Sequence, residues 1–192
     1  MRRWLAFLRN HRDAIAAMDF FTVPTLTFGV LYCFFVISHD RRRILHCNVT
    51  RNPQALWVVL QLHETWESPE PPQRFVIFDR DSKFSGDVVA TVKAIGCQPL
   101  RTAFRSPWQN GVAERWVGSV RRELLDHVFA LNRRHLRRLL NEYVRYYHGD
   151  RTHLGLNKDT PGRRPPESAT VIGKIISQPR LGGLHHRYAV AA

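Results

Sequence analysis

The sequence has only three cysteines, and their arrangement excludes two common uses of this residue. Cys33, Cys47 and Cys97 are an odd number with no paired spacing. A disulfide framework needs pairs, and a structural zinc site brings cysteines in close couples along the chain. We therefore expect three free thiols in a reducing compartment and no zinc site.

No apolar run is long enough to cross a membrane. The longest, at 26–37, falls short of the roughly 20 residues that a spanning helix needs. The N-terminal stretch MRRWLAFLRNH also lacks the apolar core and the cleavage site of a secretory signal peptide. These absences predict a cytoplasmic protein with no segment that spans a membrane.

Acidic residues are scarce. The 192 residues include 16 Asp and Glu against 29 Lys and Arg, which gives a net charge of +13. Lysine is scarce as well, so nearly all of the basic residues are arginines, whose planar forks suit phosphate oxygens. Such an excess of positive charge points to a polyanion as partner, either nucleic acid or an anionic membrane surface.

Three of the few acidic residues stand where apolar segments end or a helix begins. Asp19 follows the run AIAAM, Asp79 follows the run FVIF, and Glu114 lies in the first turn of a predicted helix. A carboxylate at such a place contributes little to packing but can bind a divalent cation. Three of them together could hold two Mg²⁺ ions, which is the arrangement of many enzymes of phosphoryl transfer.

The order of predicted elements is three strands, a helix, a strand, a helix, a strand and two helices. Aromatic and β-branched residues predict the strands, and caps and apolar periodicity predict the helices. The strands are expected at 15–23, 30–38, 43–49, 75–79 and 97–102, and the helices at 52–66, 85–95, from about 111, and at 132–148. A further strand is expected at 171–177.

Specific residues are expected to start, end or bury these helices. Asn52 and Pro53 resemble an N-cap and first helical position, Asn132 an N-cap, and Gly96 a helix end. The first long helix is expected to bury Leu56, Val59, Leu60 and His63. The helix from about 111 is expected to bury the stripe Ala113, Val117, Val120 and Leu124.

This order predicts an α/β fold with a mixed five-stranded sheet. A three-strand antiparallel meander followed by right-handed crossovers adds two parallel strands and leaves helices on both faces. The first and fourth strands then lie side by side, which makes Asp19 and Asp79 neighbours. The catalytic core is expected at 14–166, between a lead-in at 1–13 and a tail at 167–192.

Asp19, the segment DRDSKF at 79–84 and the segment PWQNGVAER at 107–115 together resemble the catalytic core of retroviral-type integrases and bacterial insertion-sequence transposases. The stretch YYHGDRTHLGL at 146–156 resembles the family as well. The resemblance implies a ribonuclease-H-like fold, DNA as partner, a homo-oligomer on DNA, and Mg²⁺, or Mn²⁺ in its place. It implies that Asp19, Asp79 and Glu114 are the catalytic and metal-binding residues.

The chain departs from the family pattern in three ways. Asp79 and Glu114 are separated by 34 residues, one fewer than usual, which a short loop deletion explains. Asp81 stands where the family often has glycine, so it competes with Asp79 as the second ligand. No helix-turn-helix pattern precedes Asp19, which leaves open a separately encoded helix-turn-helix protein as partner.

Residues around the third acid are candidates for DNA contact. Trp108 can stack on a base, and a glycine beside an arginine on one helix face lets a sugar-phosphate backbone approach. The candidates are Trp108, Gln109, Asn110, Arg115, Gly118, Arg121 and Arg122. Arg133, Arg134, Arg137 and Arg138 form a second basic patch, for which a solvated face and DNA contact are both open.

The sequence therefore predicts a DNA strand-transfer enzyme. Two alternatives remain: a ribonuclease-H-like nuclease with the same metals, and a catalytically inactive transposase remnant that binds DNA.

Overall fold

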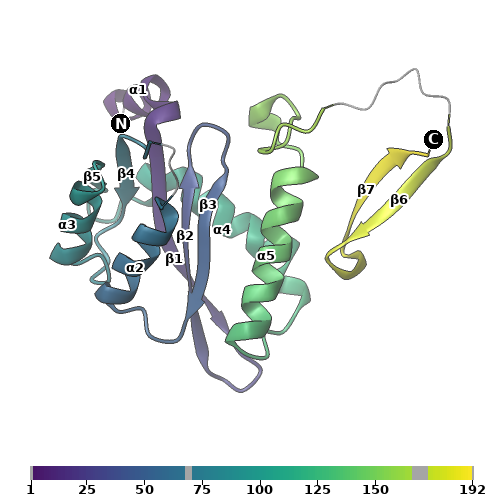
Figure 1. The fold of residues 1–192 in the computed structure, drawn as a ribbon, viewed down its shortest axis with the longest axis horizontal. Helices are drawn as coiled ribbons and strands as arrows, with labels where there is room; N and C mark the ends of the chain where they lie inside the picture. Colours follow the sequence, from purple (N-terminus) through teal and green to yellow (C-terminus); the bar gives the residue numbers. More distant parts are fainter. Residues whose placement is uncertain (1, 68–70, 166–172, 192) are drawn as a thin grey trace. The chain divides into compact units, whose positions relative to one another are not determined.

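A mixed five-stranded sheet organises the first part of the chain, as the sequence predicts. The computed structural model describes residues 2–67, 71–165 and 173–191. Three antiparallel strands form a meander, and two shorter strands extend it in parallel, in the order β3-β2-β1-β4-β5. They are β1 (Ile15–Pro24), β2 (Val30–Ser38), β3 (Ile44–Thr50), β4 (Phe75–Phe78) and β5 (Gln98–Arg101) (Figure 1).

The register of β1 and β4 determines where the first two acids lie. Ala17 pairs with Ile77, an offset of 60 residues. The same offset separates Asp19 from Asp79, which lie two residues further along the chain than Ala17 and Ile77. Neighbouring strands lie about 4.8 Å apart, so this register places the two aspartates beside each other at the open end of β4.

Helices cover both faces of the sheet. On one face, α2 (Ala55–Thr65) and α3 (Gly86–Ala94) enclose a core with Met18 and Phe34. On the other, α4 (Gly111–Glu123) buries Trp116, whose ring centroid lies 5.8 Å from that of Phe21 and 4.3 Å from that of Phe35. Because side chains alternate along a strand, Met18 and Phe21 face opposite layers. The α4 stripe is buried at Ala113, Val120 and Leu124 and only partly buried at Val117.

The expected start and buried face of α2 were wrong. The helix begins at Ala55, and Asn52 instead forms a turn in which its N–H donates to the Thr50 hydroxyl at 3.0 Å. Leu56 and Leu60 are 70% and 52% exposed, while the buried residues are Val58, Gln61 and Leu62. Val59 packs at the core margin, and His63 is exposed.

Polar groups on the edge strand explain the orientation of α2. Gln61 Oε1 accepts a hydrogen bond from Asn48 Nδ2 at 2.6 Å and lies 3.0 Å from His46 Nε2. Gln61 is buried, and an unpaired buried polar group is costly, so its pairing with the partly buried Asn48 and His46 favours the face that carries Gln61. Apolar periodicity alone does not contain this information.

Other helix boundaries agree with their sequence signals. Gly96 ends α3 with a φ of 94°, a conformation that glycine adopts without strain. Asn132 caps α5 (Arg133–Gly149), because its Oδ1 accepts a hydrogen bond from the His135 N–H at 2.9 Å. The lead-in forms α1 (Arg2–Asn10), whose Phe7 contacts Phe75. No helix in the described residues is both long and apolar enough to span a bilayer.

Two compact units make up the chain, Met1–Arg137 and Arg138–Ala192. The second contains the larger part of α5 and an antiparallel hairpin of β6 (Ile175–Arg180) and β7 (His185–Val190). The strand expected at 171–177 begins at Ile175 instead, and its first two positions lie outside the described residues. The sequence did not predict β7.

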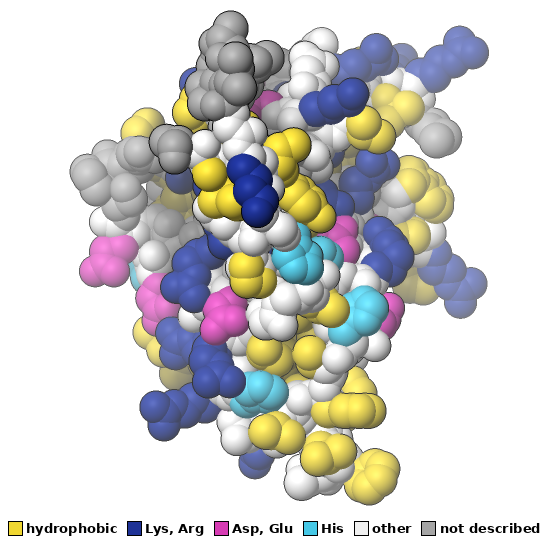
Figure 2. All heavy atoms as spheres, turned by 90° about the vertical axis from the view of Figure 1, so that its right-hand side faces the viewer, with side chains coloured by type: hydrophobic (Ala, Val, Ile, Leu, Met, Phe, Trp, Pro, Cys, Tyr) yellow, Lys and Arg dark blue, Asp and Glu magenta, His cyan; other side chains and the backbone are white. Residues whose placement is uncertain are grey.

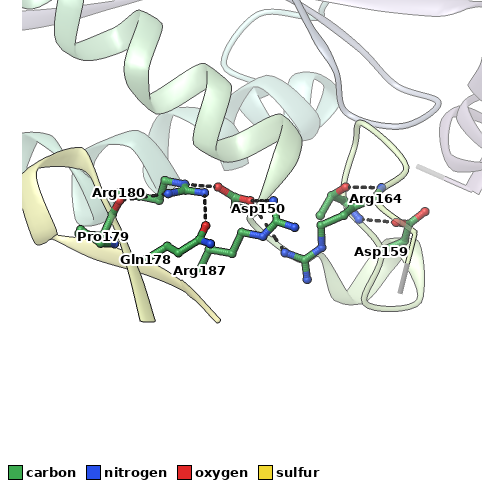
Figure 3. Close-up of polar contacts among 8 residues, drawn as sticks. Asp150, Asp159, Arg164, Gln178, Pro179, Arg180 and Arg187 are labelled. Carbon is green, nitrogen blue, oxygen red and sulfur yellow. Dashed lines mark hydrogen bonds and ion pairs between the residues drawn. The ribbon is translucent and has the colours of Figure 1, made fainter. Parts of the chain in front are cut away.

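A buried carboxylate connects the hairpin to the end of α5 within the second unit. Asp150 is contacted by the side chains of Arg180 at 2.6 Å, Arg187 at 3.4 Å and Arg164 at 3.9 Å (Figure 3). His185 stacks on Tyr146 with ring centroids 4.6 Å apart. One carboxylate thus offsets the repulsion among three guanidinium groups.

We expect Asp150→Asn to loosen the hairpin without unfolding the first unit. The amide no longer offsets the positive charges of the three arginines that contact it, and losing a hydrogen-bonded charged partner costs on the order of 1–3 kcal/mol. Hydrogen exchange at 175–190 should become faster, while exchange in β1 and β2 stays unchanged. Asp126→Asn, at an exposed acid, is the control. Equal protection of the hairpin in both variants would contradict the role of Asp150.

Basic side chains are scattered over one face of the molecule. Figure 2 shows Lys and Arg spread over the visible face among apolar, acidic and histidine side chains. This distribution agrees with the net charge of +13.

Candidate active site

The predicted acids line one cleft in the first unit. The cleft has a volume of about 720 Å³, and its wall includes Asp19, Asp79 and Glu114. Asp81 also lines it. Basic groups stand among these acids, namely Arg80, Lys83, Arg105 and Arg121.

Asp19 is the most strongly perturbed acid of this cleft. Its Oδ1 accepts a hydrogen bond from the Phe20 N–H at 2.7 Å, and its Oδ2 accepts one from Asn110 Nδ2 at 3.3 Å. Burial, together with the negative charges of Asp79, Glu114 and Asp81, raises the pKa of Asp19 to about 7, against the lowering effect of the hydrogen bond from Phe20. All three other acids therefore contribute to the pKa of Asp19.

Asp79 and Asp81 have different partners in the loop after β4. Asp79 Oδ1 accepts a hydrogen bond from the Asp81 N–H at 2.9 Å. Asp81 accepts from the Lys83 N–H at 2.9 Å and forms an ion pair with Lys83 Nζ at 2.7 Å. Burial acts to raise the pKa of Asp81, but the bonds to Lys83 and its charge outweigh burial and hold the pKa below its usual value. Asp81 is thus already neutralised within its loop.

Glu114 lies in the first turn of α4 and is exposed to solvent. Its helix packs against β1, and the buried Trp116 fixes the helix to the sheet. This packing places the start of α4 near Met18 and Asp19 in the middle of β1. The segment before it, the 3₁₀ helix Pro107–Asn110, reinforces the approach through the bond from Asn110 to Asp19.

The chemistry of the cleft fits a divalent cation. Carboxylate oxygens are the ligands of Mg²⁺, and a cation would relieve both the desolvation and the repulsion that raise the pKa of Asp19. Across the described residues, however, no three His, Cys, Asp or Glu side chains are arranged to hold a metal ion as they stand. Binding would therefore require side-chain rotation, for which the exposed Glu114 has room.

We expect Asp19→Asn to stabilise the metal-free protein above neutral pH. The folded-state pKa of about 7 lies above the value of 3.8 that applies to the carboxyl group in the unfolded chain. The stability contributed by Asp19 therefore falls as pH rises between these two values. Asparagine does not titrate, so it contributes no such change in stability with pH. In EDTA, the variant should match wild type near pH 4 and exceed it above pH 7 by between about 1 and 4 kcal/mol.

Thermal unfolding at the two pH values measures this difference. Added Mg²⁺ should stabilise wild type but not the variant, because a ligand stabilises only the state that binds it. A pH-independent difference between the two proteins would contradict the electrostatic account of Asp19.

The structure separates the candidate DNA-contacting residues into exposed and internal groups. Trp108 is 55% exposed, Arg115 is exposed, and Arg121 is exposed and lines the cleft. Gln109 braces the loop instead, since its Oε1 accepts a hydrogen bond from the Ala103 N–H at 2.6 Å. Asn110 is 2% exposed and contacts Asp19.

Gly118 makes room for an arginine rather than leaving an empty surface. A Cβ atom at this position would lie 3.0 Å from Nη1 of Arg122, so the guanidinium group of Arg122 covers the glycine. Arg122 itself is exposed. A DNA backbone that approaches this face would meet Arg122 before it reached Gly118.

Sequence reasoning missed the contribution of residues that support the acids. Asn110 also donates to the Met18 carbonyl at 3.4 Å, and its Oδ1 is buried without a hydrogen-bond partner among the described residues. Arg80 Nε donates to the Thr102 carbonyl at 3.0 Å, which ties the loop after β4 to the loop after β5. A buried amide next to a strand aspartate leaves no periodic signal in a sequence.

Comparison with known proteins supports the integrase resemblance. Residues 95–161 match the family model described as an integrase core domain, a range that includes Glu114 but neither aspartate. No curated protein is similar enough in sequence to count as a match.

Several solved structures share the fold at low sequence identity. The catalytic core domain of BIV integrase superposes with a TM-score of 0.57 and 14% identity, over 78% of this chain and 91% of that one. A chain of the simian T-cell lymphotropic virus intasome in complex with PP2A regulatory subunit B56 gamma gives 0.63 and 12%, over 92% and 66%. The Mos1 transposase catalytic domain, solved with Raltegravir and Mg, gives 0.59 and 10%, over 75% and 78%.

The chain thus has the ribonuclease-H-like fold of integrase and transposase catalytic cores, and residues 95–161 match the integrase core domain.

Proposed function

We propose that this protein catalyses DNA strand transfer with Asp19, Asp79 and Glu114 as its catalytic residues. The observation that carries the proposal is their position on one cleft, where burial and the negative charges of the other two acids raise the pKa of Asp19. The cleft belongs to a fold shared with integrase and transposase catalytic domains. A net charge of +13 suits a DNA substrate.

Each acid has a distinct part in this proposal. Asp19 would bind both metal ions, while Asp79 would complete one site and Glu114 the other. Mg²⁺, or Mn²⁺ in its place, would when bound activate the attacking hydroxyl group and stabilise the departing oxygen. Asn110 acts as a positioning residue, because its amide restrains the Asp19 carboxylate.

Neighbouring side chains would hold the DNA. Arg121 lines the cleft and can neutralise a phosphate next to the scissile one. Trp108, exposed on the loop before α4, can stack on an unpaired base. Arg115 and Arg122 extend the positive surface of α4, while Gln109 supports the loop that carries Trp108.

Activity of the purified protein on simple oligonucleotides tests this proposal. We expect nicking, or the reverse disintegration reaction, in Mg²⁺ or Mn²⁺, and none in EDTA or Ca²⁺. Joining two element ends to a target needs a multimer, so we expect a homo-oligomer on DNA. A separately encoded helix-turn-helix protein is a candidate partner.

Metal-dependent cleavage of RNA·DNA hybrids but not of DNA would identify a nuclease instead. No cleavage of any of these substrates, with DNA binding intact, would identify an inactive remnant.

A further inference from the structure

Besides the cleft with the acids, the first unit has a basic pocket between the end of β3 and the start of α5. Its volume is about 410 Å³. Three arginines, two asparagines and a threonine line it, and no acid does: Thr50, Arg51, Asn52, Asn132, Arg133 and Arg134. The two sides come from segments 82 residues apart, measured from Arg51 to Arg133.

The three arginines of this pocket carry the same charge. Within the described ranges, none of them takes part in an ion pair. Like charges gathered in one concave site repel each other, and a bound anion would relieve that repulsion. Guanidinium forks and amide N–H groups are donors that match phosphate oxygens.

Hydrogen bonds fix the backbone on both sides of the pocket. The Thr50 hydroxyl accepts from the Asn52 N–H at 3.0 Å, which closes the turn that carries Arg51. Asn132 Oδ1 accepts from the His135 N–H at 2.9 Å, which fixes the first turn of α5. Since the backbone is already ordered, binding needs to restrain only the arginine side chains.

The sheet connects this pocket to the cleft with the acids. Thr50 pairs with Tyr32 on β2, and Tyr32 pairs with Thr22 on β1. Tyr32 and Thr22 both line the cleft. Two strand spacings make about 10 Å, which equals the rise of about three nucleotides along one strand of a duplex.

We propose that this pocket binds a phosphate of the nucleic-acid backbone and is a second anchoring point for the DNA held in the cleft. The inference rests on the proposed function, because it assigns part of the same substrate to a separate site. A nucleic acid that enters the cleft can place a phosphate a few nucleotides away into the pocket.

Binding of a fluorescent DNA duplex, measured by anisotropy in EDTA over a range of salt concentrations, tests the pocket without requiring catalysis. For R133Q/R134Q we expect at least about tenfold weaker binding at physiological salt and a salt slope smaller by about 0.9, the value for one lost phosphate contact. The matched control, R138Q/R145Q, removes two exposed arginines from the same helix outside the pocket and should change affinity by less than about threefold.

Arg51 provides a second, independent arm. A shared phosphate couples Arg51 to the two helix arginines, so R51Q should weaken binding of the otherwise unchanged protein and have little further effect in R133Q/R134Q. Thermal unfolding confirms that all variants fold. Additive losses, or equal losses in R133Q/R134Q and R138Q/R145Q, would overturn the pocket as a site and leave only a diffuse basic surface.

Inorganic phosphate distinguishes the source of the ligand. If millimolar phosphate stabilises wild type but not R133Q/R134Q, while DNA affinity and slope are equal in both, the pocket binds a free anion and the DNA assignment is overturned. If wild type cleaves DNA and R133Q/R134Q binds it unchanged, the pocket inference fails and the proposed function stands. If wild type neither binds nor cleaves DNA, the proposed function fails and the pocket assignment with it.

Discussion

Replacing Glu114 with glutamine should lower metal-dependent DNA cleavage by about 10²- to 10³-fold, the loss typical when a group that stabilises charge in a transition state is removed. The amide keeps the shape of the side chain and removes the charge that a cation needs. Glu114 is exposed, so the substitution should change the melting temperature little. DNA affinity in EDTA should stay equal to or above that of wild type, because a negative charge is lost.

The loop after β4 contains a matched pair of acids for the same measurement. Asp79→Asn should abolish cleavage as Glu114→Gln does. Asp81→Asn should retain most of it, because Asp81 is already paired with Lys83 at 2.7 Å. Both substitutions remove one charge from the same cleft, so a general electrostatic effect would act on them alike. Cleavage lost in Asp81→Asn and kept in Asp79→Asn would transfer the ligand role to Asp81, and full activity in Glu114→Gln would exclude the mechanism.

The fold was predictable wherever one local signal decided it. The apolar run at 75–78 could pack only as a buried strand, and it is β4. Asn132 and Gly96 mark helix ends by backbone chemistry that needs no partner elsewhere in the chain. The strand order then followed from general connection rules.

The errors arose where a distant partner decides the structure. The buried face of α2 depends on Gln61 meeting Asn48 and His46 on β3, and the second strand of the terminal hairpin is held by Asp150. Neither pairing has a periodicity that a sequence window could detect.

The same distinction applies to the candidate site. Asp19 and Asp79 could be predicted as neighbours because strand register brings them together. Asn110 was predicted to contact DNA, yet it lies in the interior with its amide on Asp19. Only the packing of α4 against β1 could show this.

That packing leads to the largest expected effect on stability, at Trp116. This side chain is 1% exposed and lies between Phe21 and Phe35, so it holds α4 against the sheet. Trp116→Ala leaves a large cavity and should cost about 3–5 kcal/mol. Since small domains are stable by only about 5–15 kcal/mol, the variant should lose about a fifth or more of its stability in chemical denaturation.

Trp116→Phe separates packing from hydrogen bonding. The indole Nε1 is buried with no hydrogen-bond partner in the described part of the chain, so phenylalanine removes a desolvated N–H while it keeps most of the aromatic contact. We expect a cost of about 1 kcal/mol or less. Trp108→Ala, at a tryptophan that is 55% exposed in the same segment, should leave stability unchanged.

DNA cleavage, measured at a temperature where every variant is folded, tests whether this packing positions the site. Glu114 and Arg121 lie on the same helix as Trp116, so Trp116→Ala should reduce cleavage even in the folded protein, whereas Trp116→Phe should not. If phenylalanine destabilises as much as alanine, the indole N–H has an important partner and the packing argument is wrong. If Trp116→Ala is destabilised but cleaves normally once folded, Glu114 does not depend on the position of α4, and its place among the catalytic residues would lose its structural basis.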